Sequence, residues 1–204
     1  MRIVPALIVV LGCAALVPSG ARAERSPYVE RVFQQGQSQM RVGDLSAALV
    51  QFKRCLFMVE GDDDETFRMT LLVALTYEKM GDLPNAIEMY RRFLRITGRA
   101  YPSVELFWDD RRREVDYTVS ALEAQARARL ALLSIRSEPA GAAVLIDGRQ
   151  AGPDADLTSP AELFVRPGRR VVELRMGGVR VGRQVVNAVG GARHELRFGD
   201  VAEP

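Results

Sequence analysis

The first half of the chain contains two segments that repeat one another at a constant offset of 38 residues. Residues 36–56 read GQSQMRVGDLSAALVQFKRCL, and residues 74–94 read ALTYEKMGDLPNAIEMYRRFL. In each segment an amphipathic stretch ends at a Gly-Asp pair, and a second amphipathic stretch begins at once. Glycine relieves the backbone at a helix end, and a polar residue or proline suits the next helix start. The repeat therefore predicts two helix–turn–helix units that stack on each other.

Corresponding positions of the two units carry residues suited to close helix packing. Small residues recur in both helices, and an aromatic residue follows in the second helix. The positions are Gly36, Gly43, Ala48 and Phe52 in the first unit, and Ala74, Tyr77, Gly81, Ala86 and Tyr90 in the second. In this pattern the units resemble the tetratricopeptide repeat (TPR), a helix pair with a period of about 34 residues. Extra residues at 61–64, Gln39 in the place of Tyr77 and the absence of a closing proline depart from that family.

The resemblance implies a helical arm that binds a segment of a partner protein in the groove of its first helices, expected at 29–40 and 67–79. Candidate groove residues are Gln35, Gln39, Arg68 and Thr76. We expect Phe52, Tyr90 and Cys55 to pack in the core. Cys55 corresponds to Phe93 of the other unit, which favours a small buried hydrophobe over a nucleophile.

A third helical region follows the two units. Apolar residues recur at spacings of three and four from Val104 to Leu133, after Pro102-Ser103. This stripe predicts about 30 residues of amphipathic helix, in one piece or two. We expect it to cap the second unit, because two such units alone leave an apolar face uncovered. The run DDRRRE at 109–114 is expected to be a solvated face with local ion pairs, Asp109–Arg113 or Asp110–Arg113.

Beyond Ser134 the hydrophobic period changes to two. Val172 and Leu174 alternate with Glu173 and Arg175, and Gly or Pro residues separate several short runs of this kind. Such alternation and punctuation predict antiparallel strands with one buried face. The sequence thus predicts an α+β chain with a helical arm at 24–133, a small antiparallel β domain at 134–199 and a tail at 200–204.

The stretch SEPAGAAVLIDG at 137–148 opens this sheet. It carries most of a motif whose positions are Ser137, Pro139, Gly141, Ala142, Asp147, Gly148, Pro167 and Gly168. Through these positions residues 134–198 resemble the PEGA domain. Two features depart from that family, namely the inserted PDADL at 153–157 and Val179 in the place of the usual aromatic residue. The resemblance implies a small β sandwich attached to surface and cell-wall proteins. Proline bends the chain, and glycine and Asp-Gly form tight turns, so the motif predicts a shape and no chemical step.

The N-terminus has the pattern of a secretory signal peptide. Arg2 precedes an apolar run from Ile3 to Val17, and Ala21-Arg22-Ala23 is a small-x-small site, which predicts cleavage after Ala23. A lipoprotein signal with acylated Cys13 is the alternative. Without residues 1–23 the chain has equal numbers of cationic and acidic residues. That balance argues against nucleic acid as a partner, and no later apolar run is long enough to cross a membrane.

No residue pattern points to catalysis, a metal or a cofactor. His194 is the only histidine, no G-x-S-x-G motif occurs, and the acidic run at 62–65 lacks the spaced ligands of an EF-hand. We therefore expect a secreted non-enzymatic scaffold of a bacterial cell envelope, in the periplasm or at the surface. Its helical half would bind a partner protein, and its β domain would dock on the envelope or on a second protein. The alternative is a module that binds cell-wall or surface polysaccharide. It would need exposed aromatic side chains, and residues 134–204 contain only Phe164 and Phe198.

Overall fold

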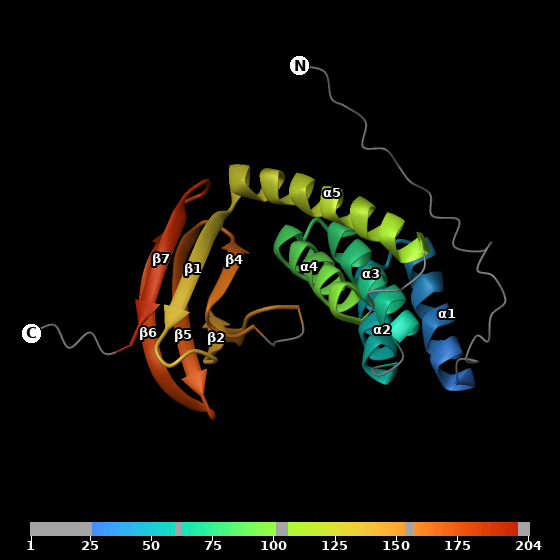
Figure 1. Cartoon of the computed structure of the whole chain (residues 1–204), viewed down its shortest axis with the longest axis horizontal. Helices are drawn as coiled ribbons and strands as arrows, with labels where there is room; N and C mark the ends of the chain where they lie inside the picture. Colours follow the sequence, from blue (N-terminus) through green and yellow to red (C-terminus); the bar gives the residue numbers. More distant parts are fainter. Residues whose placement is uncertain (1–25, 60–62, 101–105, 154–156, 200–204) are drawn as a thin grey trace, which may run out of the picture.

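A computed structural model describes residues 26–59, 63–100, 106–153 and 157–199 (Figure 1). The predicted signal peptide with Cys13 and Ala23 and the predicted tail at 200–204 lie outside the described residues. The chain contains the helices α1 (Pro27–Arg41), α2 (Leu45–Met58), α3 (Asp63–Lys79), α4 (Leu83–Ala100) and α5 (Leu106–Arg129). The strands are β1 (Ala131–Ser137), β2 (Ala143–Ile146), β3 (Arg149–Gln150), β4 (Ala161–Val165), β5 (Gly168–Met176), β6 (Val179–Ala188) and β7 (Arg193–Phe198). The predicted α+β organisation is confirmed.

The internal repeat appears as two helix hairpins with the same turn. Gly43 and Gly81 adopt φ of +84° and +72°, a region that favours glycine. The next residue donates its backbone N–H across the turn, from Asp44 to the carbonyl of Gln39 at 2.9 Å and from Asp82 to that of Tyr77 at 3.0 Å. The Asp44 carboxylate also accepts the Ala47 N–H at 3.0 Å, which caps α2. Local chemistry therefore ends one helix and starts the next.

The core of the arm is built from the small and aromatic residues of the repeat. Ala48, Phe52, Ala74, Ala86 and Cys55 are fully buried, and Tyr77 and Tyr90 nearly so. Gly36 is buried against the ring of Phe52. One continuous helix, α5, packs on α4 and buries Val115, Val119, Leu122 and Ala126 in the same core. The apolar face that two hairpins would leave open is thus covered.

The β domain is a sandwich of two sheets. One has the strand order β4-β1-β7, and the other has the order β3-β2-β5-β6. All neighbours are antiparallel except β1 and β7, which run parallel from Leu132↔Arg193 to Ser137↔Phe198. The expectation of antiparallel strands throughout is corrected at this pair, because the last strand returns beside the first. Strand β1 begins at Ala131, three residues before the expected domain start at 134.

The two halves of the chain share part of their cores. Leu132 and Phe164 lie on the outer face of the β4-β1-β7 sheet, and both belong to the hydrophobic core of the helical arm. A loop after β3 reaches α2, where the Lys53 ammonium donates to the carbonyl of Pro153. Figure 1 shows α5 crossing from the arm to the top of β1, with β4 on the side of the sandwich that faces the helices.

Candidate functional site

A cleft of about 250 Å³ lies between α4 and the β sandwich. Helix α4 supplies one wall with Ile87, Glu88 and Arg91. The other wall and the floor are apolar and come from Ile146 of β2, Leu163 and Phe164 of β4, and Leu157 of the loop between β3 and β4. Sites for drug-sized ligands usually occupy roughly 300–1,000 Å³. The cleft is therefore smaller than the usual site for a drug-sized ligand.

An edge strand borders the cleft. The N–H of Leu132 on β1 bonds to Ala192, on the side of β7, so alternate residues of β1 bond to β4. The register pairs Leu133 with Leu163, and the backbone groups of Glu162 and Phe164 must then point away from β1. Strand β4 is at the edge of its sheet. The cleft thus combines an apolar floor with outward-pointing backbone donors and acceptors.

The charged side of the cleft is an ion-pair network between α4 and α5. Arg91 Nη2 and Nε donate to Glu123 Oε1 at 2.7 and 3.2 Å, and Arg91 Nη1 lies 3.6 Å from Glu88 Oε2. Arg127 bonds to the other Glu123 oxygen at 2.7 Å, and Arg95 bonds to Glu88 at 3.2 Å. Each carboxylate is thus shared by two guanidinium groups. The network fixes the α4 wall and leaves little unbalanced charge in it.

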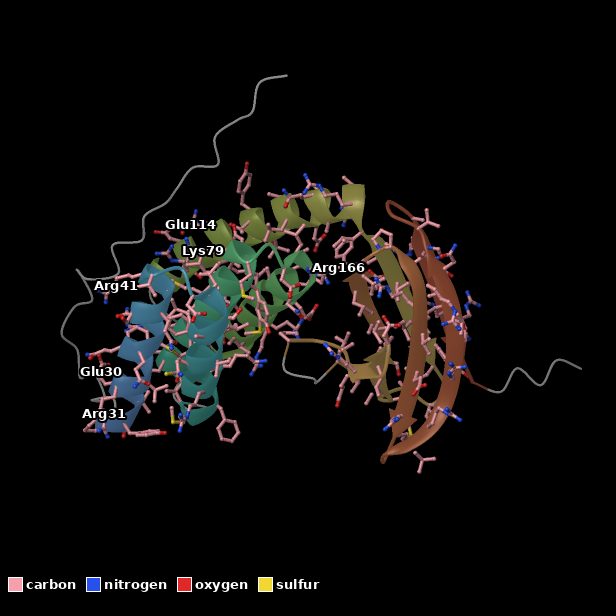
Figure 2. The ribbon with its side chains drawn as sticks, turned by 180° about the vertical axis from the view of Figure 1, so that it is seen from behind. Glu30, Arg31, Arg41, Lys79, Glu114 and Arg166 are labelled. Carbon is pink, nitrogen blue, oxygen red and sulfur yellow. The ribbon has the colours of Figure 1, made fainter. Side chains whose placement is uncertain are left out.

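The candidate groove residues do not form one surface. Helix α3 buries Met69, Val73 and Tyr77, and the 38-residue offset places Arg31, Gln35 and Gln39 at these positions of α1. Helix α3 packs between α2 and α4, whereas no described helix precedes α1. Gln35 and Gln39 therefore lie on the end face of the arm, near Arg31, which Figure 2 shows on α1 far from the sandwich.

The other two groove candidates lie on α3. Thr76 is fully buried and donates its hydroxyl to the carbonyl of Leu72 at 2.6 Å, so its prediction as a groove residue is wrong. Arg68 is half-buried and lies 3.4 Å from Glu65. Gln39 Oε1 is buried without a hydrogen-bond partner among the described residues. The cleft was missed from the sequence because its residues come from separate elements.

The motif residues of the β domain shape its turns. Gly141 adopts φ of +92° and donates its N–H to Ser159 at 2.7 Å, and Ser137 hydrogen-bonds to the Ser159 hydroxyl. Asp147 adopts φ of +52° before Gly148. Its carboxylate accepts the Val171 N–H and an Arg170 N–H, both at 2.8 Å. These bonds, the one to Val171 first, lower the pKa of Asp147 below its usual value.

Ala142 and the pair Pro167-Gly168 also serve packing and turn geometry. Ala142 is fully buried, and Gly168 adopts φ of +117° after Pro167. Pro167 lies beside Gly190 of the β6–β7 turn, where an added β-carbon would stand 3.2 Å from the proline Cγ. These motif positions therefore have roles in turn geometry or packing.

The groups that could carry chemistry are engaged in packing. His194 Nε2 accepts the Val189 N–H at 3.1 Å and so holds the β6–β7 turn. Cys55 is fully buried, with Sγ 3.8 Å from the carbonyl of Val29. Tyr90 donates to Glu78 at 2.6 Å, and burial with this carboxylate raises the pKa of Tyr90 well above its usual value. Within the described ranges no three His, Cys, Asp or Glu side chains form a metal cluster.

The run at 109–114 forms local ion pairs, and the expected pair Asp110–Arg113 is among them. Asp109 pairs instead with Arg112, at 3.8 Å. Phe164 and Phe198, 4% and 9% exposed, offer no aromatic platform for a sugar. No described helix has both the length and the apolar character needed to cross a membrane.

Comparison with known families assigns the β domain. Residues 130–189 match the model of the PEGA domain. The match begins one residue before β1 and ends one residue after β6, so α1–α5 and β7 lie outside it. No curated protein matches the chain. The part of the sandwich from β1 to β6 thus matches the PEGA domain, a module typical of extracytoplasmic proteins, and it follows the helical arm in the chain.

Proposed function

We propose that the protein is a secreted, non-enzymatic scaffold of a bacterial cell envelope. Its arm, two TPR-like units capped by α5, binds a segment of a partner protein, and its PEGA domain docks on the envelope or on a second protein. The PEGA match supports an extracytoplasmic role. The apolar N-terminal segment with the Ala23 site supports export. The 38-residue repeat supports the kinship of the arm with helical repeat proteins.

The observation that carries the partner-binding role is the cleft between α4 and the sandwich. It has an apolar floor and a charge-balanced α4 wall, it is too small for a drug-sized ligand, and the edge strand β4 borders it. An extended peptide can add main-chain hydrogen bonds to a strand edge and place alternate side chains in adjacent pockets. The cleft lies between the two halves, so a bound segment also contacts both. We therefore place the partner segment here instead of on the first helices.

Site-specific photo-crosslinking in cells tests this function. A benzophenone amino acid replaces Gln150, an exposed residue of β3 that lines the cleft. The same amino acid at Gln34, exposed on α1, is the matched control. We expect one dominant protein adduct from position 150, identified by mass spectrometry, and none from position 34. Equal adducts from both positions, or no adduct at 150 in envelope fractions, would reject the cleft as the partner site.

A further inference from the structure

The outer face of the β3-β2-β5-β6 sheet combines arginine with exposed valine. Val172 and Leu174 point into the sandwich core, so the residues that alternate with them on β5 point outward. We define the outer face by the exposed residues Arg169 and Arg175 of β5, Arg180, Val181, Arg183 and Val185 of β6, and Val189 after it. Val181, Val185 and Val189 are 53%, 48% and 53% exposed. Figure 1 places β6 on the side of the sandwich remote from the helices.

The charge of the outer face is positive. Its strands carry one described carboxylate, Glu173, which is shared by Arg183 at 3.4 Å and Arg175 at 3.8 Å. Arg180 is exposed and stands directly across from Arg175 in the β5–β6 register. Like charges at directly opposed positions destabilise a sheet. An anionic partner would relieve this repulsion, so the charges of the face are complementary to an anion-rich surface.

The arrangement fits a continuous surface better than a single anion. The arginines are spread along two strands and do not converge on one point, while exposed valines stand between them. Guanidinium groups bind phosphate in a bidentate way, and apolar side chains add affinity at the boundary between headgroups and acyl chains. We propose that the outer face docks on the surface of an anionic phospholipid bilayer. This inference rests on the proposed docking role of the PEGA domain and names the surface that docks.

Vesicle cosedimentation tests the proposal on the exported protein, with its N-terminus established by mass spectrometry. The probes are vesicles of phosphatidylcholine alone and vesicles with about 30% phosphatidylglycerol. We expect binding to the anionic vesicles at about 50 mM salt and release at about 500 mM. Binding to neutral vesicles should be at least about tenfold weaker. Equal binding to both kinds of vesicle would overturn the proposal.

A pair of double variants assigns the binding to the outer face. Arg175→Gln with Arg180→Gln should weaken binding roughly 25-fold, because each arginine near a membrane contributes about fivefold. The matched control is Arg31→Gln with Arg113→Gln on exposed positions of the arm, and it should leave binding unchanged. Circular dichroism checks that both variants fold. The same loss in both variants would overturn the assignment to this face.

Two further outcomes separate the proposals. Retention on immobilised polyglutamate without vesicle binding would identify an acidic protein as the ligand and overturn the membrane proposal. If vesicle binding fails while the crosslink from position 150 persists, this inference alone is rejected. If neither is observed, the proposed scaffold function is rejected with it.

Discussion

Gly36 on α1 and Phe52 on α2 pack so closely that no side chain fits between them. A β-carbon on Gly36 would stand 2.7 Å from Cε1 of Phe52. Phe52 is fully buried, and its ring centroid lies 6.1 Å from that of Phe33. It therefore cannot move aside without disturbing its neighbours. The absence of a side chain at position 36 sets how closely the first helix pair approaches.

The Gly36→Ala variant should lower the free energy of unfolding by about 1 kcal/mol. Overpacking a core costs about 1–3 kcal/mol, and the better helix propensity of alanine returns up to about 1 kcal/mol. Urea unfolding measures the difference. Gly98→Ala is the control, because the nearest atom to its β-carbon is the flexible Nη2 of Arg112 at 3.2 Å; it should be neutral or stabilising. Equal stabilisation by both changes would contradict close packing at Gly36.

Phe164→Ala should separate the two halves of the chain. The ring is 4% exposed and belongs to the core of the arm although β4 carries it. Its loss should cost roughly 3–5 kcal/mol and increase the radius of gyration in small-angle X-ray scattering. Phe198→Ala, which empties the sandwich core instead, should lower stability without that increase. An unchanged radius for Phe164→Ala would show that other contacts hold the halves together.

Arg91→Ala should loosen α5 from α4. The Arg91 side chain is only 28% exposed, and its guanidinium makes two hydrogen bonds to Glu123. Hydrogen bonds to charged groups contribute about 1.5–3 kcal/mol, and Arg127 remains to compensate part of the charge. We expect a loss of about 1 kcal/mol in urea unfolding. Arg113 is 78% exposed and pairs locally with Asp110, so Arg113→Ala should stay within about 0.5 kcal/mol of the wild type. Equal losses would argue against a special role for Arg91.

Asp147→Asn should reduce the dependence of stability on pH. The bonds from Val171 and Arg170 lower the pKa of Asp147 in the folded state. Between the folded and the unfolded pKa the unfolded state therefore binds more protons, and the free energy of unfolding rises with pH. The contribution is complete above the ordinary Asp pKa of about 3.9 and is lost as the pH falls through the lower folded value. Urea unfolding between about pH 6 and pH 2 should show the gap between wild type and variant closing.

The control for this change is Asp116→Asn, at an exposed position of α5. It removes the same charge without the turn contacts, so its stability should track that of the wild type across the range. A gap for Asp147→Asn that stays constant with pH would show that the carboxylate does not contribute through its ionisation.

Much of the fold could be predicted from short-range patterns. The Gly-Asp turns at 43–44 and 81–82 place the helix ends, because glycine conformation and capping act within a few residues. Alternation of Val172 and Leu174 with charged residues indicates β5 for the same reason. The site was harder to predict. Whether Thr76, Gln35 and Gln39 line a groove depends on which neighbouring helix covers each face of α3 and α1. The sequence pattern of a single helix does not contain that information.

The sequence by itself determined the two helix hairpins, the change to strands near residue 134 and the PEGA motif, since these follow from periodicity and turn chemistry. Only the tertiary structure decided that β7 runs parallel to β1, that the side chain of Phe164 on β4 packs in the core of the helical arm, and that a cleft forms along α4. These features join residues far apart in the chain. Periodicity shows that a face is apolar, but the long-range packing of the whole chain selects the surface that covers it.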